Sequence, residues 1–348
     1  MAERPKITVM VKKRAIRDIA ALAGVCVGTV SRVLNNKDRV HPETRRRILE
    51  IIERTGYWPS ALGRNLKSQQ TNSILLTLGT VVDPYCAAMV RDIAHSCGQR
   101  GYRTLLGDLD YNPALEAAYL RDLHSGYVDG LIASPLPASK NTRLFRELVK
   151  VGFPLVLIDN DVSVAKANCV KYDDVAAAEM AVDYLVEKGH QNIAFGAWRM
   201  EYQTVRGRMR GYRQGLKRRG LAIREEFLIE APPQFSDWDL ASQARKMFGR
   251  KNHPTAIVAE NEIVAVGWIH AIRQLGRCVP EDVAVVAFGD AAASPMVPMP
   301  LTTVALPLKD AAETATELLV ELMEPSRRRN GPPRKVVLPP KLIVRESA

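Results

Sequence analysis

The first regular pattern in the chain is a pair of short apolar runs with helical spacing. From Ile16 onward, apolar or small residues recur every three or four positions as far as Gly24, and the spacing then resumes and continues to Val33. Gly24 supplies the positive φ that a tight turn between two helices requires. The pattern predicts a helix-turn-helix whose second helix runs from Val27 to about Leu34. An ordinary helical hairpin in a larger core is the alternative, but the outer face is polar and the flanks are basic.

A third helical run, 42–55, follows the pair. It begins with a proline, which suits the first helical position, and a glycine comes directly after its end. Ile48, Ile51 and Ile52 fall on one face and would be buried. Three helices make a small self-contained headpiece, which we place at residues 15–60.

A short segment, 61–72, separates this headpiece from the rest of the chain. Its first eight residues, ALGRNLKS, would make only about two helical turns, and isolated helices of that length are marginal in water. The segment is therefore either a plain linker or a helix that forms only when DNA and a partner subunit provide contacts. Composition alone does not choose between the two.

From Ser73 onward, apolar strand-like runs alternate with helical runs. The predicted strands include SILLTLG, YRTLLGD, VDGLIAS and LVLID, and a second set extends from NIAFGA to VAVVAFG. Helices are predicted between them, at 85–100 and 115–123 among others. This alternation predicts an α/β fold of parallel sheets covered by helices, with enough strands for two sheets.

The positive charge is concentrated near the N-terminus. The chain has a formal net charge of +11, and residues 1–72 contain 15 Lys and Arg against 6 Asp and Glu, so nine excess charges lie there. Residues 1–14 form a basic arm within that segment. So basic a segment favours a polyanionic partner, of which nucleic acid is the commonest. A basic membrane-binding arm is the alternative, but the sequence has neither an amphipathic basic anchor nor a run of about 18 apolar residues.

The cysteines and histidines show no metal-ligand spacing. The five cysteines are scattered without a CxxC, and the six histidines contain no HExxH. The first residues also lack the apolar stretch and the cleavage site of a secretory signal. We therefore expect a cytoplasmic protein with no metal site and no cofactor.

The second helix of the predicted helix-turn-helix is the element that would enter the major groove of double-stranded DNA. The predicted DNA contacts in the headpiece are Val27, Gly28, Thr29, Ser31, Arg32 and Asn35. Arg32 can pair with guanine through two hydrogen bonds, and Val27 can touch a thymine methyl. The hydroxyls of Thr29 and Ser31 suit phosphate oxygens.

Two other functional classes compete with a DNA-binding regulator. A sugar-binding transport protein would need a signal peptide and would not need a basic headpiece. An enzyme on a Rossmann-like sheet would need a phosphate-binding or nucleophile motif, and no GxGxxG follows a strand, no P-loop occurs and no GxSxG is present. We therefore expect that the protein is not an enzyme.

Several segments occur together in one order. They are IRDIAALAGVCVGTVSRVLNN, HPETRRRILEIIERTGYWPSALGRNLKS, GHQNIAF, VPEDVAVVAFGD, PLTTV and PPKLIVRES, from about residue 15 to the C-terminus. In sequence and spacing they resemble the lactose/galactose repressor (LacI/GalR) family of bacterial transcription regulators. The resemblance implies a repressor that acts as a homodimer on a near-palindromic operator and responds to a small-molecule effector, a sugar or a sugar derivative. Both induction and co-repression by the effector are compatible with it.

The resemblance also chooses between the two interpretations of the short segment. It implies a hinge helix at 61–67 that folds on DNA, in which Leu66 and its symmetry mate wedge into the central minor groove and kink the operator. Lys67 would contact DNA beside it. Because the sequence has no C-terminal heptad segment, we expect dimers and no tetramers.

For the remainder of the chain, the resemblance implies a core of two Rossmann-like subdomains of periplasmic-binding-protein type, at 73–345. The expected subdomains are roughly 73–160 with 294–324, and 161–293 with 325–345. Three crossovers would join them, near 159–168, 288–294 and 325–336.

By the same resemblance, the effector would bind between the subdomains, at the carboxyl ends of the strands. The residues that match the family's ligand-lining positions are Asp83, Tyr85, Asp159, Arg208, Phe235, Asn261 and Asp290. Carboxylates and Asn261 would take hydroxyls, Arg208 would take hydroxyls or an acid group, and Phe235 would offer a face to a ring. Without the resemblance, a lone Asp or Arg in an α/β protein is more simply a helix cap or a surface pair.

Five positions depart from the family's pattern. Gly289 stands where many relatives have an aspartate that grips a sugar hydroxyl, which makes a simple neutral sugar a less secure ligand. Cys86 replaces a second aromatic residue of the pocket, and Glu262 replaces an aspartate. Ala15 and Cys26 replace the Thr and Ser that usually cap the two headpiece helices, each loss costing about 0.5–2 kcal/mol of helix stability.

Overall fold

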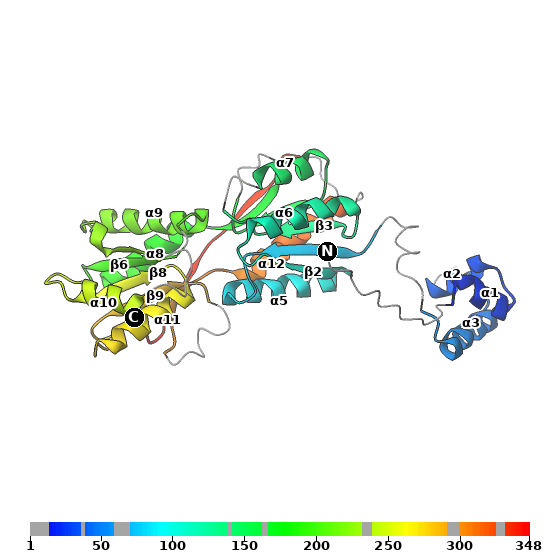
Figure 1. Cartoon of the computed structure of the whole chain (residues 1–348), viewed down its shortest axis with the longest axis horizontal. Helices are drawn as coiled ribbons and strands as arrows, with labels where there is room; N and C mark the ends of the chain where they lie inside the picture. The colour runs from blue at the N-terminus through cyan, green and yellow to red at the C-terminus, as the bar shows by residue number, and fades with distance from the viewer. Residues whose placement is uncertain are drawn as a thin grey trace, which may run out of the picture. The chain divides into compact units, whose positions relative to one another are not determined.

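The chain folds into two compact units, which divide between Gln70 and Thr71. The computed structural model describes residues 14–35, 39–58, 70–137, 141–161, 166–198, 200–231, 239–290, 299–324 and 331–348. We call the first unit the headpiece and the second the core (Figure 1).

The headpiece consists of three helices, α1 (Ile16–Ala23), α2 (Val27–Leu34) and α3 (Pro42–Thr55). Gly24 has a φ of 63°, and this left-handed conformation ends α1. The Val25 N–H then donates to the Ala20 carbonyl oxygen over 3.0 Å, which closes the turn before α2 begins. The helix-turn-helix prediction is therefore confirmed.

The headpiece has its own small apolar core. Ile19 of α1, Val30 of α2 and Ile48 of α3 are fully buried, and each comes from a different helix. Each pair of these helices is also in contact. The buried stripe predicted on α3 is present, with Ile51 buried and Ile52 partly buried beside Ile48.

The two non-standard caps make no side-chain capping hydrogen bond. Ala15 and Cys26 have the extended backbone of N-cap residues, but neither side chain accepts a capping hydrogen bond from a backbone N–H of its helix. At α1, the Asp18 carboxylate accepts from the Ala15 N–H over 2.8 Å, so one half of a capping box remains. The amino end of α2 has no equivalent acidic residue in its first turn.

The core contains two six-stranded sheets, each built from strands that are mostly parallel. Sheet 1 has the order β11-β5-β4-β3-β1-β2, and all its neighbouring strands are parallel. Its strands are β1 (Ser73–Leu78), β2 (Arg103–Asp108), β3 (Gly130–Ala133), β4 (Leu155–Ile158), β5 (Asn168–Tyr172) and β11 (Lys335–Leu338). Helices α5 (Pro84–Gln99) and α12 (Leu308–Met323) pack on one face, and α6 (Pro113–Asp122) and α7 (Thr142–Lys150) on the other. A short 3-10 turn, Leu123–Ser125, follows α6.

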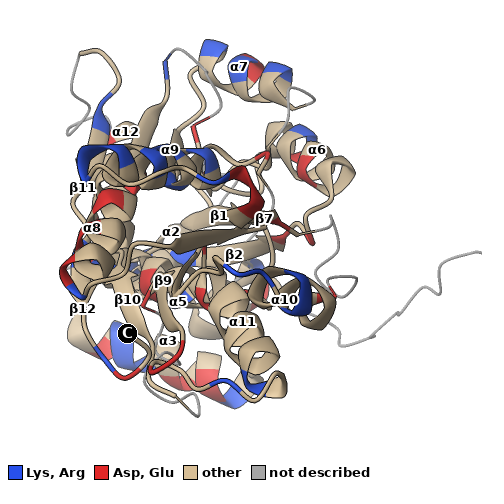
Figure 2. Cartoon of the chain, turned by 90° about the vertical axis from the view of Figure 1, so that its left-hand side faces the viewer, with Lys and Arg blue, Asp and Glu red and all other residues tan. Residues whose placement is uncertain are grey.

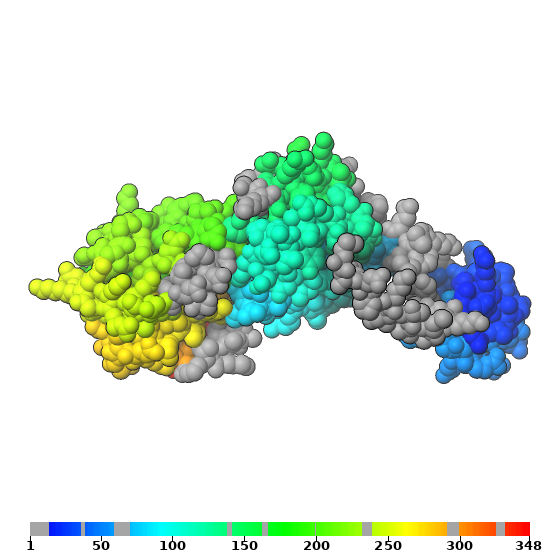
Figure 3. Space-filling view, in the orientation of Figure 1, coloured from blue at the N-terminus to red at the C-terminus, as the bar shows by residue number. Residues whose placement is uncertain are grey.

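Sheet 2 repeats this plan with the order β12-β10-β9-β8-β6-β7, in which only the β10–β12 pair is antiparallel. Its strands are β6 (Ile193–Ala197), β7 (Leu228–Glu230), β8 (Ala256–Ala259), β9 (Ala284–Phe288), β10 (Thr302–Ala305) and β12 (Lys341–Ile343). Helices α8 (Asp174–Glu187) and α9 (Gln203–Arg218) cover one face, and α10 (Leu240–Phe248) and α11 (Glu262–Gln274) the other. A 3-10 turn, Glu225–Phe227, precedes β7. Each sheet with its helices forms one lobe of the core (Figure 3).

The expected subdomain boundaries require correction, because strands pair with different sheets than expected. β5 pairs with β4, with Val170 opposite Ile158, and β11 pairs with β5, so both strands belong to sheet 1. β10 pairs with β9 and belongs to sheet 2. Subdomain 1 is thus 71–172 with 308–338, and subdomain 2 is 174–305 with 341–348. The bounds and the three crossovers that we inferred from the resemblance were therefore misplaced, because position along the chain does not tell to which neighbour a strand hydrogen-bonds.

Helix α9 is rich in arginine, but acidic residues of α8 neutralise one end of it (Figure 2). Arg218 pairs with Glu179 at 2.7 Å and with Asp183 at 2.6 Å. Arg219, which follows the helix, pairs with Asp183 at 2.6 Å and with Glu187 at 2.9 Å. These salt bridges join the carboxyl end of α9 to α8 within the core.

Within the described part of the chain, no helix combines the length and the apolar character needed to cross a bilayer.

Candidate functional site

The core has a pocket of about 820 Å³, which includes space open to solvent, where the carboxyl ends of strands from both sheets meet. Seven of its 21 described lining residues come directly after a strand. Subdomain 1 contributes Gly79 after β1, Ser134 after β3 and Asp159 after β4. Subdomain 2 contributes Trp198 after β6, Glu260 after β8 and Gly289 after β9. A ligand here would therefore contact both subdomains.

Asp83 and Tyr85 stand at the amino end of α5, on the subdomain 1 side of the pocket. The Tyr85 N–H donates to Asp83 Oδ1 over 2.8 Å, so this aspartate is the N-cap of the helix. Burial raises the pKa of Asp83, although the helix N–H groups oppose that shift. The Tyr85 ring lies edge-on to Tyr172, with ring centroids 6.3 Å apart. Cys86 lines the pocket, and burial raises the pKa of its thiol to about 12, which keeps it protonated.

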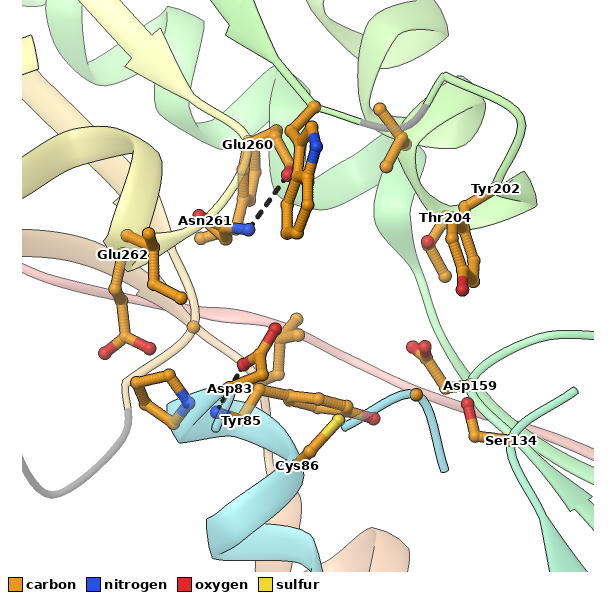
Figure 4. Close-up of a pocket in the computed structure, with 18 of the residues that line it drawn as sticks. Asp83, Tyr85, Cys86, Ser134, Asp159, Tyr202, Thr204, Glu260, Asn261 and Glu262 are labelled. Carbon is orange, nitrogen blue, oxygen red and sulfur yellow. Dashed lines mark hydrogen bonds between the residues drawn. The ribbon is translucent and has the colours of Figure 1, made fainter. Parts of the chain in front are cut away.

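Asp159 has a strained backbone conformation, with a φ of 66° that non-glycine residues rarely adopt. Its carboxylate faces the pocket (Figure 4) and accepts from Asn160 Nδ2 over 3.0 Å. Burial, and then the charge of Asp174, raise the pKa of Asp159 to about 7, against the attraction of Arg208. Strain of this kind is characteristic of functional sites.

Arg208 projects from α9 and is 7% exposed. Its Nε donates to Asp174 Oδ1 over 3.0 Å, and its Nη1 donates to the Glu260 carbonyl oxygen over 2.6 Å. The guanidinium also lies 5.0 Å from the centroid of the Phe288 ring. These bonds within the protein hold Arg208 in place.

Close contact between α8 and α9 positions Arg208. A Cβ atom added at Gly207 would lie 2.9 Å from the Cβ of Asp174, and one at Gly211 would collide with the Val175 carbonyl oxygen. The absence of side chains at both positions lets the helices approach until Arg208 and Asp174 pair. Sequence analysis singled out Arg208 but missed its partner, because Asp174 lies on another helix.

Glu260 and Asn261 follow β8 and lie next to each other in the pocket wall (Figure 4). Asn261 Nδ2 donates to Glu260 Oε1 over 2.9 Å, and Asn261 Oδ1 accepts from the Val264 N–H over 2.8 Å to cap α11. Glu260 is 4% exposed, and burial raises the pKa of its carboxyl to about 8 despite the nearby Arg208.

A carboxylate from another element lies beside Gly289. Gly289 has a φ of 96°, and a Cβ atom built there would lie 3.0 Å from Glu262 Oε2. Glu262, at the start of α11, therefore places its carboxylate beside this glycine and lines the same pocket. Two of the positions that depart from the family's pattern are thus neighbours in space.

Aromatic residues complete the wall, and the sequence analysis did not single them out. Tyr111, Trp198 and Tyr202 line the pocket, and the Tyr111 and Trp198 rings meet edge-on with centroids 5.7 Å apart. Trp198 directly follows β6, so its position at a strand end was a signal that could have identified it. Tyr111 follows β2 at a distance of three residues, where the signal is weaker.

The pocket brings together five of the seven expected effector residues: Asp83, Tyr85, Asp159, Arg208 and Asn261. Asp290 is not among the residues that line it. Its carboxylate pairs with Arg345 Nη1 at 2.8 Å and accepts from Thr303 Oγ1 over 3.1 Å. Phe235 lies outside the described residues.

The exposed face of α2 carries the expected DNA contacts of the headpiece. Val27 is 39% exposed, Arg32 is exposed and Gly28 adds no side chain. Thr29 Oγ1 lies 3.3 Å from Cys26 Sγ. Asn35 Nδ2 donates to the Ser31 carbonyl oxygen over 2.8 Å and approaches Ser31 Oγ at 3.3 Å, so this asparagine caps the carboxyl end of α2. The expected hinge helix, with Leu66 and Lys67, lies outside the described residues.

The headpiece and the core together define a class of protein, a helix-turn-helix DNA-binding transcriptional regulator with a periplasmic-binding-protein-like core. Residues 15–60 match the family described as bacterial regulatory proteins, lacI family, and residues 182–348 match a periplasmic binding protein-like domain. The chain is 31% identical over 336 residues to the HTH-type transcriptional regulator DegA of Bacillus subtilis, which covers 96% of this chain and 98% of DegA. The chain therefore belongs to the LacI family.

Other relatives and solved structures agree. The chain is 31% identical to catabolite control protein A of Priestia megaterium over 88% of this chain and 92% of that protein. It is 29% identical to the transcriptional repressor CytR of Escherichia coli over 89% of each chain. The structure of the Lac repressor dimer bound to operator and an anti-inducer covers 96% of this chain and 99% of its own, with a TM-score of 0.83 at 23% identity. The structure of the regulator CelR in complex with cellobiose covers 97% of this chain and 100% of its own, with a TM-score of 0.71 at 26% identity. The relatives are named regulators and repressors, not enzymes.

Proposed function

We propose that this chain is a repressor whose affinity for its operator is controlled by a sugar or sugar derivative bound in the core pocket. The observation that carries the proposal is the pocket itself, which combines polar side chains from both subdomains with aromatic walls. Sugars are bound by such combinations, since hydroxyls take hydrogen bonds and the apolar faces of the ring stack on aromatics. The complex of the related regulator CelR with cellobiose supports this class of ligand.

The proposed roles follow from the contacts of each side chain. The carboxylates of Asp83 and Asp159 accept hydrogen bonds from ligand hydroxyls, and the Asn261 amide can both donate and accept them. The Tyr85 ring lines the pocket beside them. Arg208 keeps the walls in place through its bonds to Asp174 and to the Glu260 carbonyl. Asp290 has no role in this scheme, because its carboxylate is engaged with Arg345.

We propose that a homodimer reads a near-palindromic operator with one α2 helix in each half-site. Arg32 provides the specific base contact, Val27 an apolar one, and Thr29 and Ser31 contact phosphates. Lys67 would contact DNA beside Leu66, which would wedge into the central step of the operator. A dimeric Lac repressor bound to its operator supports the expected assembly.

Ligand and DNA would be linked through the angle between the subdomains. The chain passes between them three times, at residues 173, 306–307 and 339–340, so a ligand that contacts both lobes favours one angle over another. In a dimer, that angle sets the spacing of the two segments that lead to the headpieces. The linkage works in both directions, and its sign distinguishes an inducer from a co-repressor.

The test uses the full-length protein. An operator is first selected from random duplex DNA, and its affinity is then measured by fluorescence anisotropy with and without each member of a sugar panel. We expect one class of sugar to change operator affinity by about 5–150-fold. The proposal is contradicted if the protein selects no duplex sequence. It is also contradicted if no sugar changes the operator affinity or the melting temperature of the protein.

A further inference from the structure

The charges that line the pocket are mostly negative. Four carboxyl side chains line it, namely Asp83, Asp159, Glu260 and Glu262. Among the described lining residues, Arg208 is the one Lys or Arg. The four acidic groups come from both subdomains, so a bound ligand would lie among them whichever way it is oriented (Figure 4).

Two of the five N–H groups of Arg208 are already engaged within the protein. Its Nε is bonded to Asp174, which is 8% exposed, and its Nη1 is bonded to the Glu260 carbonyl oxygen. A carboxylate or phosphate that reached the remaining N–H groups would lie near Asp159 and Glu260, which act on the same guanidinium and would repel an anion when ionised. These neighbours disfavour the acid group that the sequence led us to expect at Arg208.

The pocket wall also contains a buried acceptor. Asn160 lines the pocket and is 5% exposed, and its Oδ1 accepts no hydrogen bond from the described residues. A buried acceptor of this kind needs a donor, and an ammonium group offers three donors and no acceptor. The aromatic side chains Tyr111, Trp198 and Tyr202 add faces that attract cations.

We propose that the effector is a polyhydroxylated compound with a protonated primary amine, of which an amino sugar is the simplest kind, and that the pocket discriminates against carboxylated and phosphorylated sugars. This inference rests on the proposed function of the pocket as the effector site. It deepens that function because a net negative pocket whose guanidinium is already bonded selects ligands by charge as well as by shape.

The titration of the pocket gives the proposal a thermodynamic signature. The pKa of Asp159 is raised to about 7 and that of Glu260 to about 8, so near pH 7 both carboxyls are partly protonated in the free protein. A bound ammonium favours the ionised form, lowers both pKa values and releases protons. A neutral sugar of the same shape does not. The charged and titratable groups that act on these two carboxyls are Asp83, Tyr85, Lys171, Tyr172, Asp174 and Arg208.

The experiment compares sugars that differ in one group. Full-length protein is titrated calorimetrically at pH 7 with glucosamine, glucose and glucuronate, and with galactosamine, galactose and galacturonate. Two buffers of different ionisation enthalpy are used, neither of them a primary amine. In at least one set, we expect the amine to bind about tenfold or more tighter than its neutral and acidic counterparts, with net proton release.

Variants identify the groups that recognise the charge. Glu260→Gln and Asp159→Asn should each lower the preference for the amine over the neutral sugar about tenfold and reduce the proton release. Because Asp159 is also proposed to bind hydroxyls, its variant should weaken the neutral sugar as well, but less than the amine. Glu313→Gln on α12 is the matched control, since its carboxylate is exposed and lies outside the lining residues. If a pocket variant fails to fold, the proton release of the unmodified protein remains an independent readout.

The outcomes separate the two proposals. The inference about charge is overturned if the neutral or acidic sugars bind as tightly as the amine or more tightly, or if the amine binds without proton release. In either case the pocket remains an effector site. If no member of either set binds or changes the melting temperature, the proposed function of the pocket fails, and the inference fails with it.

Discussion

At the scale of single residues, the site depends on a few side chains whose partners decide their roles. Asp83 and Asn261 each cap a helix and also line the pocket, so a structural contact does not exclude either residue from the proposed effector site. Asp290 pairs with Arg345 and is not among the described residues that line the pocket. Asn261 and Asp290 both stand two residues after a strand, so the partners of the side chain, and not its position in the sequence, separate the two cases.

Arg32 is the residue expected to carry operator specificity. Arg32→Ala should cost about 1–3 kcal/mol on the preferred operator and relax the preference at one base pair of each half-site. Ser31→Ala is the comparison, and it should weaken binding to all sequences alike, because a phosphate contact carries no sequence information. Anisotropy titrations on selected and random duplexes measure both. Equal losses for Arg32→Ala on the two duplexes would make it a phosphate contact.

Gly289 and Glu262 are expected to be coupled. Gly289→Asp should destabilise the core by about 1–3 kcal/mol, because φ is 96° there and the new Cβ would lie 3.0 Å from Glu262 Oε2. Adding Glu262→Ala should restore the part of the loss that comes from this contact. Urea denaturation of the two single variants and the double variant measures the coupling. Additive effects would show that the two side chains do not compete for the same space.

At the scale of elements, the packing of α8 against α9 positions the buried cation of the pocket. Gly207, Gly211 and Gly215 all face α8, where added Cβ atoms would contact Asp174, Val175 or Val182. The chain pays for this close approach with three glycines in one helix, each costing about 0.5–1 kcal/mol relative to alanine. The Arg208–Asp174 pair follows from it.

Gly211→Ala tests this packing. The added Cβ would collide with the Val175 carbonyl oxygen, so the helices must separate, and we expect a loss of about 1–3 kcal/mol together with weaker effector binding. Gly98→Ala on α5 is the control, because no atom lies within 4 Å of the new Cβ and the substitution should be neutral or stabilising by about 0.4–1 kcal/mol. Thermal and urea unfolding report stability, and calorimetry reports binding. The same small effect for both variants would contradict the role given to this contact.

At the scale of the whole molecule, charge is divided between the two units. Residues 1–72 carry nine of the eleven excess positive charges, and Arg218 and Arg219 at the end of α9 in the core are paired with acids of α8. Attraction to DNA is therefore concentrated in the N-terminal part of the chain. The core has strong local charge of the opposite sign in its pocket.

Operator binding should accordingly depend strongly on salt. Each phosphate contact contributes about −0.9 to the slope of log affinity against log salt concentration, and two headpieces in a dimer provide several contacts. The slope is obtained from anisotropy titrations between low and physiological salt. A slope near zero would contradict an electrostatic contribution of the headpiece.

The sequence by itself determined the local features of this protein. The spacing of apolar residues and the glycines at 24 and 56 were enough for the three helices of the headpiece, whose bounds agree with the prediction. Most strands of the core were also recognisable, because a buried parallel strand is a continuous apolar run. The motifs of the LacI family, which are local as well, gave five pocket residues.

Only the tertiary structure decided the features that depend on contacts between distant parts of the chain. Three features belong to this group. They are the assignment of β5, β10 and β11 to their sheets, the salt bridge of Arg208 with Asp174, and the position of the Glu262 carboxylate beside Gly289. The physical reason is that hydrogen-bond partners, burial and charge neighbours are set by distances in space. A periodic pattern reports which face of an element is buried, but not which other element buries it.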